Sequence, residues 1–585
     1  MIRAARRAAL VLALVCAGAI SANAAPQTPA TALGPEASPD ASVVTPNPAP
    51  TKQLTSDAAE TIARTSRRLN AWLDEHSVKR TAAVFDEKKQ EWTVSFIDAK
   101  EVVIAVVLVN DDRSSVTETR TGPQVAWQMA RGYEGAFGRA ITEPQIWIPL
   151  LMLFLAPLLR WRRLASLHTL DLLVLSGLSV SLVWFNRGEI FTSVPLVYPP
   201  MAYLAARLAW VGLRGSRRRT TFTPEDLAEA PVTRRPHLDS WCPTWLLVTV
   251  LLLALGLRLG LNAFDSNVVD VGYAGVIGAD RIAHGQTPYG TFPSDCGQCD
   301  TYGPLTYLTY IPFELAMPWG GTWNDLPAAH GAAVLFDLVA LLGMIVLGWR
   351  LGGRRLGIGL GVAWATFPFT AYALESNSND SLVAACLVWG LVGAHKPVAR
   401  GLALGLAIMS KFSPALLIGL WSRPPFPRAA RTRRRVGAYL VGLAIAGIAT
   451  GWVVLLDADD GVRAFWSRTL GYQLDRESPF SIWGQHSWLR PVQIGLSLLV
   501  LLFALFVTFR PRRLDLRAFA ALSGALIIGM QMTVTHWFYL YIPWFLPFAF
   551  VALIPEWPAV RPPVAPPPPD HMPHADESLT LETVP

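Results

Sequence analysis

Long apolar runs, interrupted by short polar segments, fill the chain from about residue 145 to residue 555. Several runs reach the ~20 residues that an α-helix needs to cross a bilayer. The pattern predicts crossings at about residues 145–160, 168–186, 194–213, 245–264, 326–349, 356–373, 381–395, 437–456, 489–508, 516–534 and 537–554. The chain is therefore predicted to be an all-α polytopic membrane protein with about 11 transmembrane helices.

Two other apolar stretches do not fit a simple crossing. Residues 401–421 carry basic residues at both ends, and both ends are expected on the same side of the membrane. We expect this stretch to enter and return, with MSKFSP at its turn. The same argument makes residues 302–319 an exterior or re-entrant helix pair. Such non-spanning backbone is stable only where protein or water surrounds it.

Arginine and lysine clusters all fall on one side of this threading. They lie at residues 3–7, 160–163, 214–219, 234–235, 350–355, 396–400, 428–435 and 510–513. Short basic loops stay in the cytoplasm, so the clusters predict an orientation. The loop from about residue 265 to residue 326 is then exterior, and the C-terminus is cytoplasmic.

The chain ahead of the first span divides into three parts. Residues 1–24 have a basic start, an apolar core and an Ala-Asn-Ala site, which predicts a signal peptide. An uncleaved first helix is the alternative. Residues 25–56 are rich in Pro, Ala, Thr and Ser, and are predicted to be a disordered linker. Residues 57–140 predict a small extracytoplasmic α+β module, with a helix at about 58–74, strands at 91–98 and 101–110, and a helix at 123–133.

The rest of the chain divides into three more parts. Residues 145–240 hold three spans and a cytoplasmic loop, and residues 241–555 form the main membrane domain. Residues 556–585 are a Pro-rich cytoplasmic tail that cannot build a core.

Composition narrows the class further. The chain is 52% hydrophobic with a mean hydropathy of +0.34, which excludes an ordinary soluble enzyme. The net charge of +7 comes largely from juxtamembrane clusters, so lipid contact explains it and nucleic acid is not an expected partner. Cys296 and Cys299 form CGQC in the exterior loop, where a local disulfide is expected.

The segment where the span 245–264 meets the exterior loop holds the strongest candidate chemistry. Asp265 lies where the helix leaves the membrane, and Asp270 follows within a few residues. A partly desolvated carboxylate has a raised pKa, as a general base requires. Arg258 lies on roughly the same helix face, ~10 Å deeper. It is expected either to meet a lipid phosphate or to pair with Asp265.

Six features, in this order, resemble the bacterial polyprenol-phosphate-sugar-dependent glycosyltransferases of the GT-C class, especially their mannosyltransferase branch. They are the acidic residue that opens the loop, the G-x-x-P-Y element at residues 285–289, TYGPLTYLTYIPF, GLALGLAIMSKFSP, YQLDRESPFSIWG and THWFYLYIPW. The resemblance covers about residues 240–555. Residues 91–116 are similar to the PepSY module of exported bacterial proteins.

The resemblance implies an activity on the outer face of a bacterial plasma membrane. A sugar, most simply mannose, would pass from a polyprenyl phosphate to a cell-envelope glycan, glycolipid or glycoprotein acceptor. The implied reaction is an inverting single displacement, with Asp265 as the first choice of base and Asp270 as the second. Arg258, Lys411, Arg468 and Arg476 are the candidates for binding the donor phosphate.

Substrate-binding candidates come from three of these motifs and from the ESNSND cluster at residues 375–380, which is expected at an outward helix junction. They are Tyr289, Tyr302, Asn377, Asn379, Asp380 and His536. Plain structural roles compete with these assignments. Asn379 or Ser378 would cap the helix that follows, His536 would be a hydrogen-bonded interfacial residue, and Lys411 would extend to the cytoplasmic interface.

No metal or other cofactor is expected. The chain lacks an Asp-x-Asp at the key loop, and the spacing of Asp265 and Asp270 does not place both on one helix face. The chief alternative function is a multi-pass transporter or lipid flippase, although no second broken hairpin suggests an inverted repeat. A non-catalytic membrane scaffold is the other alternative.

Overall fold

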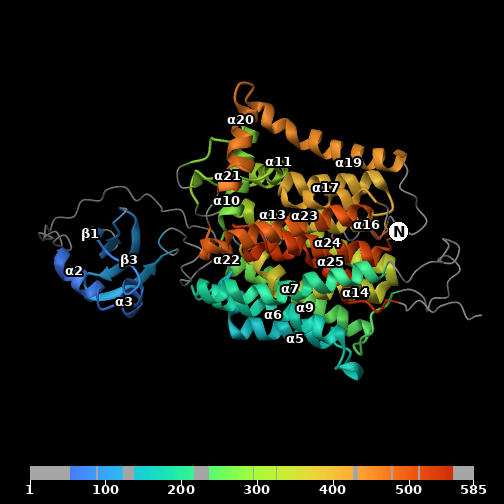
Figure 1. Ribbon diagram of the computed structural model, residues 1–585, viewed down its shortest axis with the longest axis horizontal. Helices are drawn as coiled ribbons and strands as arrows, with labels where there is room; N and C mark the ends of the chain where they lie inside the picture. Colours follow the sequence, from blue (N-terminus) through green and yellow to red (C-terminus); the bar gives the residue numbers. More distant parts are fainter. Residues whose placement is uncertain are drawn as a thin grey trace, which may run out of the picture.

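The computed structural model describes residues 53–86, 90–99, 101–122, 125, 138–215, 236–293, 296–323, 326–423, 425, 433–475, 478–511 and 514–557. The expected signal peptide, almost all of the linker and of the helix at 123–133, most of the 214–240 loop and nearly all of the tail lie outside these residues. A small module that contains a sheet lies at one end of the long axis of a larger helical bundle (Figure 1).

The module is a four-stranded antiparallel sheet with two helices. The helices are α2 (Ser56–Ala63) and α3 (Arg67–Leu73), and the strands are β1 (Arg80–Asp86), β2 (Glu91–Ile97), β3 (Val103–Asn110) and β4 (Ser115–Thr121). The strands pair in the order β1-β2-β3-β4. Trp92, Val94 and Phe96 alternate along β2 and pack against Ala59 and Leu69 of the helices. The two predicted strands are confirmed, but two more flank them, and the single predicted helix is two.

The bundle contains all the remaining helices. They are α5 (Pro144–Leu158), α6 (Leu167–Phe185), α7 (Ile190–Gly215), α9 (Thr244–Phe264), α10 (Asp270–Ala283), α11 (Pro304–Leu308), α12 (Ile311–Ala316), α13 (Pro327–Gly352), α14 (Arg354–Thr366), α15 (Pro368–Glu375), α16 (Asp380–Val392), α17 (Pro397–Ser410), α18 (Ile418–Trp421), α19 (Arg433–Gly451), α20 (Gly461–Trp466), α21 (Tyr472–Asp475), α22 (Ile482–Gln485), α23 (Arg490–Phe509), α24 (Leu516–Gln531) and α25 (Leu546–Leu553). Short 3-10 or π turns join them: η2 (Arg139–Thr142), η3 (Trp161–Arg163), η6 (Ser413–Leu417), η7 (Trp452–Leu456), η8 (Ser467–Gly471), η9 (Ser487–Leu489) and η10 (Tyr539–Trp544).

All eleven predicted spans are helical along most of their length, but eleven crossings are not confirmed. Among the described residues, five helices are long and apolar enough to cross a membrane, or up to six if the bent pair α14 and α15 counts as one span. The shorter apolar helices α5, α16, α17 and α24 have 13 to 16 residues. At 1.5 Å per residue each is shorter than the ~30 Å hydrocarbon core.

The predicted return of residues 401–421 is confirmed. The chain runs along α17, turns at Lys411 and comes back through η6 and α18. Near the start of α17, Arg400 Nε donates a hydrogen bond to the backbone oxygen of Trp421 over 2.6 Å. The helix pair expected at residues 302–319 is also present as α11 and α12, and Gly303 N–H donates to Ser410 O at the end of α17.

Connecting segments from distant parts of the sequence gather at one end of the bundle. Helices α10, α11, α20, α21 and α22 all lie toward the end that faces the β-module (Figure 1). Val269 N–H donates to Ser376 O, which joins the start of α10 to the turn between α15 and α16. This end of the bundle brings most of the predicted site residues together.

Candidate functional site

A buried ion pair joins Lys411, which follows α17, to Asp380, the first residue of α16. Lys411 Nζ donates to Asp380 Oδ1 over 2.8 Å, and the two side chains are 6% and 0% exposed. Trp544 Nε1 donates to the same carboxylate oxygen over 2.9 Å. The Lys411 amino group is therefore held in the interior, and the alternative that it extends to the cytoplasmic interface is wrong.

Three aromatic rings surround the Lys411 ammonium group. The ring centroids of Tyr302, Tyr541 and Trp544 lie 5.0, 5.2 and 5.5 Å from Nζ. Tyr541 and Trp544 stack with their centroids 4.4 Å apart. Such rings attract a cation through their quadrupoles, most strongly where water is excluded. We call Lys411, Asp380, Tyr302, Tyr541 and Trp544 the lysine cage.

The turn between α15 and α16 holds Asp380 in place through Asn377. Asn377 adopts a positive φ of 50°, and its Nδ2 donates to Ser266 Oγ over 3.1 Å and to Asn267 O over 3.0 Å. Its Oδ1 accepts a hydrogen bond from Asn262 Nδ2 over 2.7 Å. Both ends of the Asn377 amide thus bind the segment that leaves α9. This arrangement favours a structural role for Asn377 over substrate binding.

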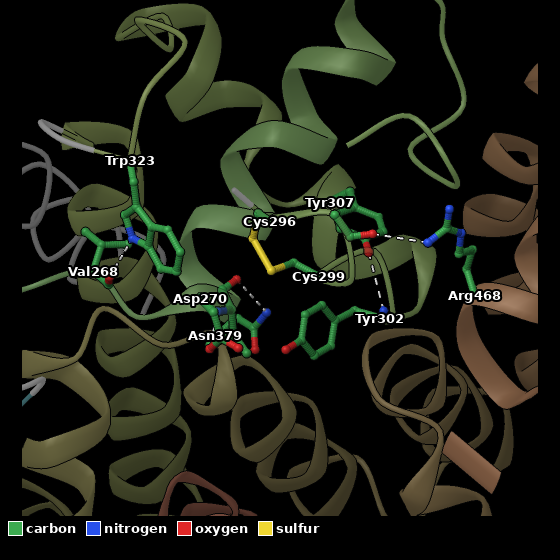
Figure 2. The surroundings of a disulfide bond; sticks show 11 residues. Val268, Asp270, Cys296, Cys299, Tyr302, Tyr307, Trp323, Asn379 and Arg468 are labelled. Atoms are coloured by element: carbon green, nitrogen blue, oxygen red, sulfur yellow. Dashed lines mark hydrogen bonds between the residues drawn. A yellow bond between two sulfur atoms is a disulfide. The ribbon is translucent and has the colours of Figure 1, made fainter. Parts of the chain in front are cut away.

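Asn379 precedes α16 but makes no side-chain capping bond. Ser378 takes part of that role, since its Oγ accepts from Asp380 N–H over 3.1 Å and its hydroxyl donates to the Asp380 carboxylate. Figure 2 shows Asn379 next to Asp270. The side chain of Asn379 therefore faces the start of α10.

The two candidate bases, Asp265 and Asp270, lie in different surroundings. Asp265 ends α9 and is exposed, and its charge acts on Glu375. Asp270 begins α10 and is half-buried. Asp270 and Asp380 both act electrostatically on the hydroxyl group of Tyr372. Asp270 lies next to Asn379 (Figure 2), the residue that precedes Asp380 of the lysine cage.

Arg258 is buried inside the bundle, and both of its terminal nitrogens are engaged. Its Nη2 donates to Asp337 Oδ1 over 2.6 Å and to Thr370 O over 2.9 Å, while Nη1 donates to Trp364 O over 3.0 Å. These bonds fix the bend between α14 and α15 to α9 and α13. The expected pairing with Asp265 is wrong, because Asp337 is the partner. With both terminal nitrogens engaged, Arg258 is a poor candidate for binding a phosphate.

Arg468 binds the disulfide loop, residues 296–300. Cys296 and Cys299 are joined by a disulfide, which confirms the expected local bridge. Arg468 Nε lies 3.6 Å from Asp300 Oδ2, and Nη1 donates to Gly297 O over 3.1 Å. Figure 2 shows Arg468 reaching this loop from a separate part of the chain.

The carboxylate of Asp300 is buried, and this explains the contact with Arg468. Gly290 N–H donates to Asp300 Oδ2 over 2.6 Å. Burial raises the pKa of Asp300, while the Gly290 hydrogen bond and the charge of Arg468 lower it. The Arg468 side chain is still 34% exposed. It can therefore stabilise the loop and still offer positive charge to a ligand.

The remaining predicted residues lie around the cage. Tyr289 is buried, and its hydroxyl donates to Tyr302 O over 3.1 Å, so it supports a cage residue from behind. His536 Nδ1 lies 2.9 Å from Ser478 Oγ, and its ring centroid lies 6.3 Å from that of Tyr541. Arg476 lies outside the described residues.

Sequence reasoning missed three residues here: Asp337, Tyr541 and Trp544. The sequence contained a signal for Asp337, because an ionisable residue within an apolar helix requires a partner. The two aromatic cage residues lay inside THWFYLYIPW, but nothing in the sequence separated them from the other rings. Across the described ranges, no group of three or more His, Cys, Asp or Glu residues is placed to hold a metal ion.

Comparison with known proteins supports one class of function. Residues 301–535 match the sequence model of glycosyltransferase family 87. The match covers less than half of the chain and includes Tyr302, Asp380, Lys411 and Arg468. It supports a membrane glycosyltransferase of the GT-C class. No curated protein matches the chain.

Proposed function

We propose that this protein transfers a sugar, most simply mannose, from a polyprenyl phosphate to a cell-envelope acceptor on the outer face of the plasma membrane. The observation that carries the proposal is the lysine cage, a buried cation inside the region that matches glycosyltransferase family 87. Asp270 lies at the same end of the bundle. The proposal includes no metal or other cofactor.

The reaction is an inverting single displacement. The acceptor hydroxyl gives its proton to the aspartate base as its oxygen attacks the anomeric carbon. The bond between that carbon and the phosphate oxygen breaks, and polyprenyl phosphate leaves with the electron pair. Positive charge near the phosphate stabilises the negative charge that develops on it.

Asp270 is the better candidate for the base. It is half-buried, so its carboxylate is partly desolvated, whereas Asp265 is exposed. Asp270 also lies beside Asn379, which precedes Asp380 of the cage (Figure 2). A base must lie within hydrogen-bond reach of the acceptor while the phosphate meets a cation. Asp270 therefore suits the role of base better than Asp265 does.

Lys411 and Arg468 are the candidates for the donor phosphate. Lys411 is the buried one, and a phosphate oxygen competes with Asp380 for its ammonium group. Arg468 is partly exposed and paired with Asp300 over a longer distance of 3.6 Å. A lysine would act as a point charge, and an arginine as a two-pronged donor.

The test is sugar transfer by the purified protein in detergent, with radiolabelled polyprenyl-phosphate mannose and envelope acceptors. Asp270→Asn is expected to reduce the turnover rate by about 10²–10⁴-fold, the usual contribution of a general base. Asp265→Asn, a matched change five residues earlier, is expected to reduce it much less.

If Asp265→Asn lost transfer and Asp270→Asn kept it, the base would be Asp265. Movement of the lipid in sealed vesicles by wild-type protein, with no new glycosidic bond from any polyprenyl-phosphate sugar, would favour a transporter or flippase. Wild-type phenotype in cells from both variants would favour a scaffold.

A further inference from the structure

Several buried polar atoms near Asp380 have no hydrogen-bond partner within the part of the chain that the structure describes. Among them are the hydroxyl oxygen of Tyr310, Oδ1 of Asn379 and Oγ of Ser381, and these side chains are at most 1% exposed. Tyr310 and Asn379 both contact α10. An unsatisfied buried polar atom costs stability, because it has given up water and gained nothing in exchange. Native proteins keep few such atoms, so several near one buried charge need an explanation.

Close packing fixes the Tyr310 ring. A Cβ on Gly275 of α10 would lie 2.6 Å from the ring, which shows how closely the two approach. Phe336 of α13 contacts the same ring edge to face, with centroids 5.6 Å apart. The charge of Asp380 acts on the hydroxyl. Gly275 lies one turn along α10 from Val271, whose backbone oxygen Asn379 approaches, so the Tyr310 ring and the Asn379 amide contact neighbouring turns of the same helix.

Packing also fixes the Asn379 amide. Its Nδ2 lies 3.5 Å from Val271 O, and the side chain lies beside Asp270 (Figure 2). The amide nitrogen thus faces the start of α10. The unpartnered atom is the oxygen, which can only accept a hydrogen bond.

We propose that Tyr310 and Asn379 form the subsite that binds hydroxyl groups of the donor sugar. The inference rests on the proposed function. A ligand that satisfies both atoms must donate to Asn379 Oδ1 and must donate to or accept from Tyr310. A sugar ring carries several hydroxyl groups that do both. The phosphate of the donor would bind Lys411, which is hydrogen-bonded to Asp380, the residue after Asn379.

The Tyr310 hydroxyl keeps its proton for this purpose. Burial raises its pKa, and the charge of Asp380 raises it further, so the group remains a neutral donor and acceptor. This differs from Tyr307, one turn earlier, whose hydroxyl already accepts a hydrogen bond from Tyr302 N–H over 3.3 Å.

The subsite is closed in this structure, since solvent reaches neither atom. Helices α11 and α12, between which Tyr310 lies, have only five and six residues, and each has a proline in its first turn. The proposal therefore requires this short pair to shift outward when a sugar binds. Binding of the sugar then provides the hydrogen bonds that the closed state lacks.

The test compares Tyr310→Phe with Tyr439→Phe, which removes a different buried hydroxyl. Tyr439 donates a hydrogen bond to Ile418 O over 3.0 Å, in the hairpin that contains α18. Thermal unfolding of the purified protein is measured alone, with sugar-free polyprenyl phosphate, and with polyprenyl-phosphate mannose or glucose. Transfer kinetics follow for each variant. Asn379→Ala is tested in the same way, with Asn186→Ala as its control, because Asn186 Nδ2 is bonded to Thr142 Oγ1 over 3.1 Å.

Tyr310→Phe is expected to keep or raise the melting temperature, and Tyr439→Phe to lower it. A sugar-bearing lipid should stabilise the wild type more than sugar-free lipid does. The difference in melting temperature between protein with sugar-bearing lipid and protein with sugar-free lipid is the sugar increment. It should disappear in Tyr310→Phe and Asn379→Ala but remain in both controls. The KM for the donor should rise about tenfold in each subsite variant, as for one lost hydrogen bond.

The inference is overturned if Tyr310→Phe lowers the melting temperature as much as Tyr439→Phe does. It is also overturned if the sugar increment survives in the subsite variants, or if no sugar-bearing lipid exceeds sugar-free lipid in the wild type. A wild type that shows the increment but transfers no sugar would instead overturn the proposed function and leave the subsite standing.

Discussion

Two buried cations, Arg258 and Lys411, differ in the groups that surround them, and this difference favours a structural role for Arg258 and ligand binding for Lys411. Arg258 is paired with Asp337 and also donates to backbone oxygens at a helix bend. Lys411 is paired with Asp380, and aromatic rings rather than backbone oxygens surround it. A phosphate would therefore displace fewer hydrogen bonds at Lys411 than at Arg258.

Lys411→Met tests the cage directly. The substitution leaves Asp380 as a buried carboxylate without its cation, so the free energy of unfolding should fall by about 3–5 kcal/mol. Transfer should be lost as well. The double variant Lys411→Met/Asp380→Asn removes both charges and should recover most of the stability.

Activity separates the two roles of Lys411. If Lys411 binds the donor phosphate, the double variant stays inactive although it is folded, as judged by its melting temperature. Recovery of transfer together with stability would show that Lys411 acts only by holding the fold.

Sequence predicted individual residues only where a residue type carried its own constraint. Lys411 at a turn between two apolar segments was identifiable, because a lone cation there needs a partner. Its partner Asp380 was grouped with its neighbours, and their different roles depend on a turn with positive φ at Asn377. Tyr310 was not identifiable, because Tyr307 also packs against a glycine of α10, and only the lack of a hydrogen-bond partner for the Tyr310 hydroxyl among the described residues distinguishes the two.

At the scale of elements, the disulfide loop connects two parts of the exterior region. Arg468, just after α20, reaches Asp300, while Gly290 N–H bonds to the same carboxylate. Two residues beyond Asp300, Tyr302 contributes its ring to the lysine cage. The position of the loop therefore bears on the position of a cage residue.

Removing the disulfide is expected to loosen this loop. Cys296→Ser/Cys299→Ser opens a four-residue loop, and chain entropy alone predicts a loss of about 2 kcal/mol. The KM for the donor should rise several-fold, with a smaller change in turnover rate, because Tyr302 becomes less well positioned. Both parameters are measured by the transfer assay.

Reduction of the wild type with dithiothreitol should reproduce the effect of Cys296→Ser/Cys299→Ser. The double serine variant serves as the control, since dithiothreitol should leave it unchanged. An unchanged KM in both the reduced protein and the serine variant would mean that Asp300 and Arg468 hold the loop without the bridge.

Elements were predicted well where a long apolar run defined them. The helices α6, α9, α13 and α23 begin and end within a few residues of their predicted limits, because charged or polar residues border their apolar runs. Strands β1 and β4 were missed because each is half-buried and carries charged or hydroxyl residues, so neither shows a dense apolar run. Pro368 divides one predicted span into α14 and α15, since proline cannot continue the helix before it.

At the scale of the whole molecule, two arginine-bearing junctions and the lysine cage lie at opposite ends of the bundle. The junctions of α5 with α6 and of α13 with α14 carry arginines. The opposite ends of α9, α15 and α17 are joined by the contacts around the lysine cage. The β-module lies beyond this second end, and the ring of Trp72 lies 6.4 Å from that of Phe191 at the start of α7. This arrangement fits a site and a module that face the same compartment.

Single cysteines at exposed positions test the orientation. Thr322→Cys lies between α12 and α13, and Asp459→Cys lies between η7 and α20, both at the proposed outer face. Arg162→Cys lies between α5 and α6, at the proposed cytoplasmic face. A membrane-impermeant maleimide should label Thr322→Cys and Asp459→Cys in intact cells, but should label Arg162→Cys only after permeabilisation.

The wild-type chain serves as the blank for this labelling. Among the described residues, Cys296 and Cys299 are bonded to each other, and the free cysteines are Cys242, which is buried, and Cys386, which is half-buried in α16. If only Arg162→Cys were labelled in intact cells, the orientation would be the reverse of the proposed one. A reversed orientation would place the lysine cage on the cytoplasmic side, where soluble nucleotide sugars are available. The donor would then need no lipid carrier, so this measurement bears on the chemistry of the reaction as well as on topology.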